Sequence, residues 1–239
     1  ALPISFTVLM NHELGNTQGI SRAHGSAGAL VSQWIVDKNT LAVTGAKDLI
    51  SSVVTWNSSI TAYNPPGTTA IARLCSGDLP SVTAFSNGAL GTTERIFMSG
   101  EEAGAEGRLF AHIATGPNAG TSYELPRHGK FSWENSLAAP YQQDMTIVIG
   151  TDDTTPGEVY VYVGTKTSTG TEVDKAGLTN GLLYGIKVEG GAAQAEDRDT
   201  AFGIAKGSTK PFSLVAAPNG GNVENTTGAQ LQAAHATDG

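Results

Sequence analysis

Five acidic residues stand just after runs that have the composition of β-strands. They are Glu13, Glu101, Glu102, Asp152 and Asp153. If these strands belong to hairpins arranged around a common axis, their ends meet at one end of a central channel. Carboxylates gathered there repel one another unless a cation lies among them, and hard divalent cations such as calcium prefer oxygen ligands. The placement predicts a shared cation site, against the alternative that each acid is a solvated turn residue.

The single cysteine, Cys75, also follows a strand-like run and precedes the polar turn 76–78. A lone cysteine is most often a small buried apolar residue. If its thiolate joins the carboxylates, softer ions such as iron or zinc are favoured over calcium alone. A further acid, Glu134, lies beside Trp133 in the crowded stretch 128–135, and is a candidate for the same site.

Two of the five histidines, His12 and His128, lie next to acidic positions. We expect them to hold a carboxylate by a hydrogen bond rather than to ligate a metal. Four arginines flank the same loops, where each either neutralises an acid or offers a planar fork to a phosphate. They are Arg73, Arg95, Arg108 and Arg127, and Arg127, beside His128, is the best placed for substrate binding.

Short strand-like runs with turn signals between them recur along the chain, and hardly any helical pattern is present. Three hairpins are predicted, joining 30–36 to 41–45, 94–99 to 108–114 and 145–150 to 158–164. Further strands are predicted over 4–10, 70–74 and 183–189. The pattern predicts an all-β fold, with sandwiches, closed sheets and propellers all compatible. The tail 190–239 is less regular and rich in Gly, Ala, Thr and Asn, with a short helix over 226–235 capped by Thr226 or Thr227.

Composition limits the partners and the location. The formal net charge of −8, without any run of basic residues, argues against a nucleic-acid partner. No apolar stretch approaches the roughly 18 residues of a membrane helix. The chain starts at Ala1 and has one cysteine, so processing of a secretory signal is plausible and an intrachain disulfide is excluded. We expect a secreted or periplasmic protein.

Five short motifs follow one another in an order that resembles the PhoX-type alkaline phosphatase family of bacterial secreted and periplasmic proteins. They are 10-MNHELG-15, 74-LCSGD-78, 98-MSGEEAG-104, 127-RHGKFSWEN-135 and 148-VIGTDD-153 with 157-GEVYVYVG-164 behind it. The resemblance covers about Met10 to Val188. It implies a six-bladed β-propeller and phosphomonoester hydrolysis by a cluster of iron and calcium ions.

Carried over by motif, the resemblance implies metal ligands at Glu13, Cys75, one or both of Glu101 and Glu102, and Glu134, with Trp133 as a wall of the site. Asp152 and Asp153 lie in the family's acidic strand-end motif. The chain corresponds to the N-terminal part of such a propeller, 1–239 forming one incomplete domain. A second chain or a C-terminal fragment is therefore expected to complete the sheet arrangement, because open sheet edges associate readily.

Two other functions stay open from the sequence. One is a calcium-stabilised propeller for binding or surface assembly, without turnover, since propeller loops are binding surfaces whatever their ancestry. The other is a different propeller hydrolase, such as a lactonase, which needs calcium but no cysteine ligand. The favoured hypothesis is a metal-dependent phosphoesterase acting on a small phosphoester, with calcium and iron, or zinc in place of iron.

Overall fold

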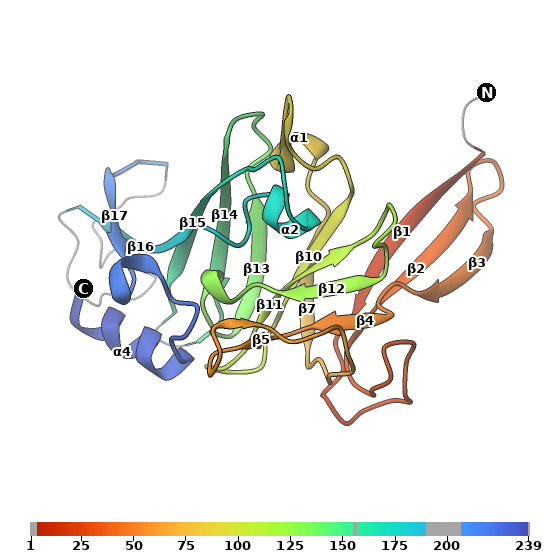
Figure 1. Ribbon diagram of the computed structural model, residues 1–239, viewed down its shortest axis with the longest axis horizontal. Helices are drawn as coiled ribbons and strands as arrows, with labels where there is room; N and C mark the ends of the chain where they lie inside the picture. Colours follow the sequence, from red (N-terminus) through yellow and green to blue (C-terminus); the bar gives the residue numbers. More distant parts are fainter. Residues whose placement is uncertain (1–3, 155–156, 190–206, 239) are drawn as a thin grey trace.

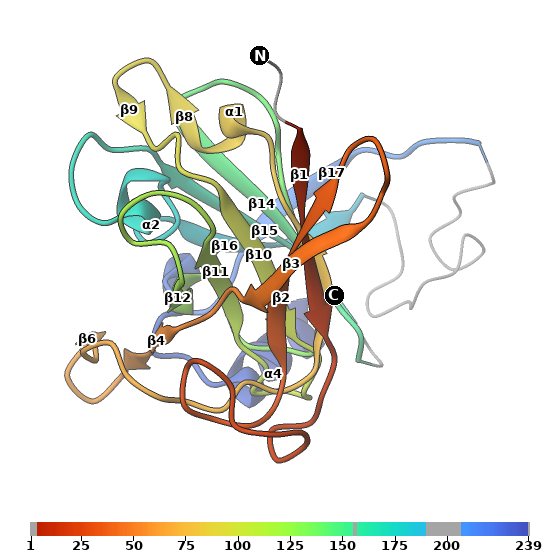
Figure 2. The same cartoon turned by 90° about the vertical axis from the view of Figure 1, so that its right-hand side faces the viewer.

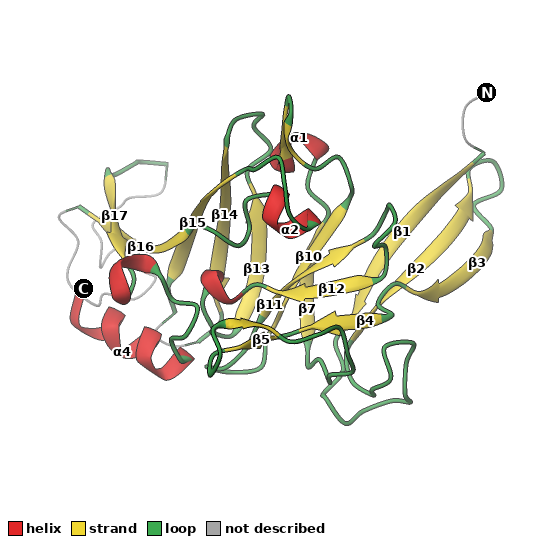
Figure 3. Ribbon diagram, in the orientation of Figure 1, coloured by secondary structure: helices red, strands yellow, loops and turns green. Residues whose placement is uncertain are grey.

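The computed structural model describes residues 4–154, 157–189 and 207–238. Strands make up most of the ordered structure, and the helices are short segments beside the sheets (Figure 3). The larger strands are β1 Ser5–His12, β2 Leu30–Asp37, β3 Val43–Asp48, β4 Ser52–Val54, β7 Leu74–Asp78, β10 Ile96–Glu101, β11 Leu109–Ile113, β12 Thr121–Glu124, β13 Trp133–Ala138, β14 Met145–Asp152, β15 Val159–Thr165, β16 Leu182–Val188 and β17 Phe212–Ala216.

The remaining elements are short. Two small hairpins pair β5 Trp56–Asn57 with β6 Ala62–Tyr63 and β8 Ser86–Asn87 with β9 Leu90–Gly91. The helical segments are α1 Val82–Phe85, η1 Pro126–His128, α2 Glu172–Lys175, η2 Asn219–Gly221 and α4 Gly228–Asp238. Thr227 precedes α4, and its side chain accepts from the Gln230 backbone amide at 3.2 Å, while Gln230 Oε1 accepts from the Thr227 backbone amide at 2.9 Å. The predicted C-terminal helix and its Thr227 cap are confirmed.

Three sheets begin with an edge strand, β1, β7 or β13, that pairs with an antiparallel neighbour, and in the middle sheet β4 joins β12 in parallel. Their strand orders are β1-β2-β3, β4-β12-β11-β10-β7 and β13-β14-β15-β16-β17. The edge strands β1, β7 and β13 lie next to one another, because β7 contacts both of the others. Among the described residues no sheet closes on itself. The all-β prediction is confirmed by these sheets (Figure 1).

The middle sheet is buried on both faces. Alternate side chains of a strand point to opposite faces, and here the two sets pack into two different cores. On β10, Ile96 and Met98 face the core shared with the β13–β17 sheet, whereas Phe97 faces the core shared with β1–β3. On β11, Leu109 and Phe110 divide in the same way. The three sheets are therefore stacked face to face, as the view from the β1–β3 end also indicates (Figure 2).

Within the part of the chain that the structure describes, each outer sheet has an apolar face that stays exposed. The pairing register places Phe6, Val8, Met10 and Val43 on one face of β1–β3, and all four are exposed. The outward face of β13–β17 carries a longer row. It consists of Leu137, Met145, Ile149, Val159, Phe212 and Leu214. The sheets bearing these faces lie at opposite ends of the long axis (Figure 1).

The three predicted hairpins are confirmed, with β2 paired to β3, β10 to β11 and β14 to β15. The strand expected over 70–74 instead runs over 74–78. Arg73 has a left-handed backbone with φ of 43°, which no strand residue adopts, so the strand starts after it. β17 was missed inside the tail 190–239, of which 190–206 and 239 lie outside the described residues. None of the described helices is long and apolar enough to cross a membrane.

Candidate metal centre

The predicted ligands approach one another because, in antiparallel neighbours, the end of one strand lies beside the start of the next. β1, β10 and β14 end where β7 and β13 begin. Glu102 directly follows β10, and Glu13 directly follows β1. Cys75 is the second residue of β7 and Glu134 the second of β13.

Two β-bulges occur at this end of the strands, one at Cys75 and one at Glu134. Between β10 and β7, Ser99 pairs with Gly77 and Glu101 with Leu74, so β7 has one extra residue in the segment that contains Cys75. Between β13 and β14 the pairing passes from Trp133 to Asn135, which leaves Glu134 as the extra residue. Bulges redirect side chains and are frequent beside functional sites.

Two groups of donor atoms result, and they share one residue. Glu13, Cys75 and Glu102 each offer an atom within 4.8 Å of the others, and so do Glu102, Glu134 and Asp153. We call these five residues the acidic cluster. Ligand atoms around a cation at 2.3–2.6 Å lie at most about 5 Å apart, so the spacing fits a bound ion. Carboxylate oxygens with one sulfur suit calcium or iron.

Arg73 is the cation that the chain itself supplies to the cluster. Its Nη2 donates to Glu13 Oε1 at 2.8 Å and to Glu102 Oε1 at 2.7 Å. The hydrogen bond to Glu102 is the main reason that the pKa of Arg73 is raised. With four carboxylates and one guanidinium, the cluster has a formal charge of −3 when the thiol is neutral.

Cys75 is half-buried and its Sγ lies 3.5 Å from Glu134 Oε2, to which the thiol donates. Desolvation, together with the neighbouring Glu102 and Glu134 carboxylates, raises the pKa of the thiol to about 12. Without a cation the thiol therefore keeps its proton at neutral pH. A bound metal reverses this preference, since coordination favours the thiolate.

Polar side chains fix the bulged segments. Asn11 donates from Nδ2 to the carbonyls of Cys75, at 3.2 Å, and Ser76, at 3.0 Å. Ser76 donates to the Glu134 carbonyl and lies 2.9 Å from Asn135 Oδ1. These contacts join β1, β7 and β13 behind the donor atoms. Neither Asn11 nor Ser76 was predicted from the sequence as a site residue, although Ser76 adjoins Cys75 and Asn11 lies two residues before Glu13.

Trp133 directly precedes Glu134 on β13. It is buried and stacks on Phe131 with ring centroids 3.9 Å apart. Two glycines make room for it, because a Cβ at Gly100 would lie 2.2 Å from Trp133 Cβ and one at Gly150 would lie 2.5 Å from its ring. That Trp133 forms a wall of the site stays a prediction, since these contacts are those of a core residue.

Glu101 lies outside the cluster, contrary to its prediction as a ligand. Its carboxylate is buried and accepts from Arg108 at Nε and Nη2, both at 2.7 Å, and from the amides of Ala72 and Arg108 at 2.9 and 3.1 Å. Every oxygen is satisfied inside the protein. Asp152 is also outside, since it caps its own turn by accepting from Thr154, and desolvation raises its pKa.

The three predicted supporting residues lie elsewhere as well. His12 pairs with Ser32 Oγ at 2.7 Å rather than with a carboxylate. His128 is fully buried against Tyr162, with ring centroids 3.7 Å apart, and no partner within the described residues reaches its ring nitrogens. Arg127 forms an ion pair with Glu224 at 2.8 Å. Of these predicted and flanking residues, Arg73 is the one that offsets part of the negative charge of the cluster.

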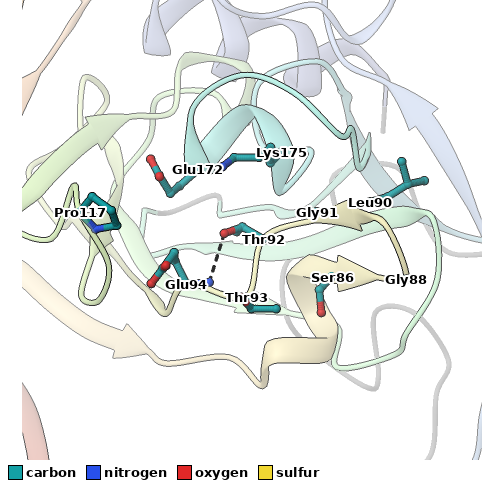
Figure 4. Close-up of a pocket in the computed structure, with 10 residues that line it drawn as sticks. All are labelled: Ser86, Gly88, Leu90, Gly91, Thr92, Thr93, Glu94, Pro117, Glu172 and Lys175. Atoms are coloured by element: carbon teal, nitrogen blue, oxygen red, sulfur yellow. Dashed lines mark hydrogen bonds between the residues drawn. The ribbon is translucent and has the colours of Figure 1, made fainter.

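A cavity of about 350 Å³ lies beside β8, β9 and α2 (Figure 4). Glu94 and Glu172 line it, but each already accepts from a neighbour, Thr115 at 2.6 Å and Asn118 at 3.0 Å respectively. Glu94 precedes β10 whereas Glu102 follows it, so the cavity and the cluster lie at opposite ends of that strand. None of the predicted ligands lines this cavity.

Comparison with known proteins gives a fold relationship. No family model and no curated protein matches the sequence. One solved structure, Pseudomonas fluorescens PhoX in complex with vanadate, a transition state analogue, matches with a TM-score of 0.60 at 10% sequence identity. The match covers 98% of this chain and 51% of that chain, so this chain spans about half the length of the structure it resembles. The chain has a PhoX-like fold.

Proposed function

We propose that this protein is a metal-dependent phosphomonoester hydrolase of PhoX-like type. The observation that carries the proposal is the pair of overlapping donor groups that share Glu102, at the end where β1, β7 and β13 meet. The PhoX-like fold supports it, because the matched structure holds a transition-state analogue. The proposed ligands are Glu13, Cys75, Glu102, Glu134 and Asp153.

Iron and calcium held by these residues would supply Lewis-acid stabilisation of phosphoryl charge and an activated oxygen nucleophile. The chain's own side chains do the positioning. Asn11 and Ser76 hold the bulged segments of Cys75 and Glu134 in place. Without a cation the charge of the cluster repels a phosphate dianion, so substrate binding requires that the metal be present.

The proposed substrate is a small phosphomonoester, and secretion or export to the periplasm is proposed with it. We also propose that the chain forms part of a six-bladed propeller. The exposed apolar faces of the two outer sheets support this, since a blade packed on each would bury them. A second chain or a further segment would supply those blades.

Metal analysis with a Cys75→Ser variant tests the chemistry. Purified protein should contain iron and calcium by elemental analysis, and should hydrolyse p-nitrophenyl phosphate. Complete chelation should abolish that hydrolysis. Cys75→Ser should lose iron and activity and retain calcium, because the serine hydroxyl is a poor ligand for iron. The matched control is Glu189→Gln, which removes an exposed carboxylate outside the cluster.

Full hydrolysis after complete removal of metal would contradict the proposal. Retention of calcium alone, unaffected by Cys75→Ser and without hydrolysis, would instead identify the second candidate function, a calcium-stabilised propeller for binding. A specific observation favours that alternative: four of the five donor residues are carboxylates, and an oxygen-rich donor set suits calcium.

A further inference from the structure

Arg73 is held in an unfavourable backbone conformation by contacts beside two of the proposed ligands. Its φ of 43° is uncommon for a residue with a side chain. The Arg73 amide donates to the Leu14 carbonyl at 2.8 Å, and its carbonyl accepts from the Glu102 amide at 2.9 Å. Leu14 directly follows Glu13. The same local structure therefore fixes Arg73, Glu13 and Glu102 relative to one another.

A single nitrogen of Arg73 lies between the two carboxylates. Nη2 is 2.8 Å from Glu13 Oε1 and 2.7 Å from Glu102 Oε1. Those residues also form the donor group with Cys75, in which the ligand atoms lie within 4.8 Å of one another. A calcium ion needs ligand oxygens at 2.3–2.6 Å, so the nitrogen takes nearly the place that a cation would take.

We propose that Arg73 is a built-in counter-ion that competes with a divalent cation for Glu13 and Glu102. This inference rests on the proposed metal site. The guanidinium has no lone pair available for a metal and stays charged at any physiological pH, so it cannot share this position with a cation. Metal binding displaces the side chain, and metal loss returns it to the carboxylates.

The side chain is suited to reversible displacement. Its exposed fraction is 48%, so water can solvate the guanidinium once it leaves. Exposed ion pairs are weak, and a weak competitor lowers metal affinity without blocking the site. Removing the guanidinium should therefore tighten calcium binding about three- to tenfold, since both the competition and the charge repulsion are lost.

Calorimetric titration of calcium into metal-stripped protein tests the inference. The variants are Arg73→Gln and Arg73→Gly, the second of which also relieves the left-handed strain because glycine adopts positive φ readily. Arg95→Gln is the control, since it removes the same charge from a side chain that donates to the Leu79 and Pro80 carbonyls. Both Arg73 variants should bind calcium more tightly than wild type and Arg95→Gln.

Equal or weaker calcium binding by both Arg73 variants would overturn the competition while leaving the proposed function intact. An absence of calcium binding by wild type and Arg95→Gln would overturn the metal site and this inference together. If Arg73→Gln does not fold, Arg73→Gly gives the same readout. Dependence on ionic strength adds a check, because the ion pair weakens with salt and the gain from either substitution should shrink.

Discussion

Glu101 and Glu102 are adjacent in the sequence and belong to two different electrostatic regions. Glu101 is buried and matched to Arg108, which reaches both of its oxygens, with two backbone amides completing its hydrogen bonds. Glu102 shares the single Arg73 guanidinium with Glu13 and lies within 4.8 Å of further donor atoms. One carboxylate is fully satisfied by the fold, whereas the other belongs to a group with excess negative charge.

The difference separates an acid that stabilises the fold from acids that are available to a ligand. A buried carboxylate with a bidentate arginine and amide donors has no free lone pair for a metal. Among the described side chains, the four carboxylates of the acidic cluster share the Arg73 guanidinium and the Cys75 thiol as donors, and an added cation would supply further positive charge. Glu101 and Glu102 are alike in residue type and adjacent in sequence. They differ in the number of hydrogen-bond donors around each carboxylate.

The largest expected change in the free energy of unfolding comes from substituting the buried acid, Glu101. Glu101→Gln should lower the free energy of unfolding by about 3 kcal/mol or more, because it leaves Arg108 without its counter-ion in a mostly buried site. Urea denaturation followed by circular dichroism measures this change. A loss below about 1 kcal/mol would mean that Glu101 is not the structural acid described above.

Calcium should stabilise the protein through the cluster. At a free concentration of about one hundred times Kd, a ligand specific for the folded state adds about 2.7 kcal/mol to the free energy of unfolding. Glu102→Gln should lose most of this gain, since Glu102 belongs to both donor groups, whereas Glu189→Gln should keep it. Thermal melts with calcium and with chelator provide the measurement, and equal gains in both variants would contradict the assignment.

The pH dependence of stability reports on two buried histidines, His112 and His128, which lie outside the cluster. Burial lowers the pKa of His112 and of His128 to about 3. The unfolded chain binds these protons near pH 6.5, so the stability contributed by the neutral rings is present above pH 6.5 and is lost as the pH falls toward 3. The slope approaches about 1.4 kcal/mol per pH unit for each histidine.

His128→Phe isolates one of those contributions. Phenylalanine preserves the stack on Tyr162 and cannot titrate, so the loss of stability between pH 6.5 and pH 5 should shrink by about 2 kcal/mol relative to wild type. Chemical denaturation at the two pH values measures it. An unchanged pH dependence would show that His128 does not stay neutral in the folded protein.

The smallest expected change in stability is that of a cluster substitution in metal-free protein. Glu102→Gln should change the free energy of unfolding by less than about 1 kcal/mol in chelator, because Arg73 is half exposed and the substitution also relieves repulsion among carboxylates. Comparison with Glu101→Gln under identical conditions sharpens the contrast. Similar losses in the two variants would remove the distinction between the regions.

Much of the fold follows from local patterns in the sequence. The three hairpins are set by alternating runs and by turns such as the Asp37 turn, where the side chain accepts from the amides of Asn39 and Thr40. Thr227 and Gln230 determine the start of α4 in the same local way. β17 was missed because a strand of five residues in a Gly- and Ala-rich tail acquires its stability from pairing with β16.

The sequence by itself determined that acids and one cysteine stand at strand ends, because strand length and turn chemistry are local properties. Only the tertiary structure decided which of them meet. The bulges that redirect Cys75 and Glu134 arise from pairing between strands. Of the four arginines expected near the acids, Arg73 is the one that pairs with Glu13 and Glu102, because its backbone is held by Leu14 and Glu102. Glu101 was removed from the site by Arg108 across the hairpin. A carboxylate's partners are a matter of distance in space, and sequence spacing does not record that distance.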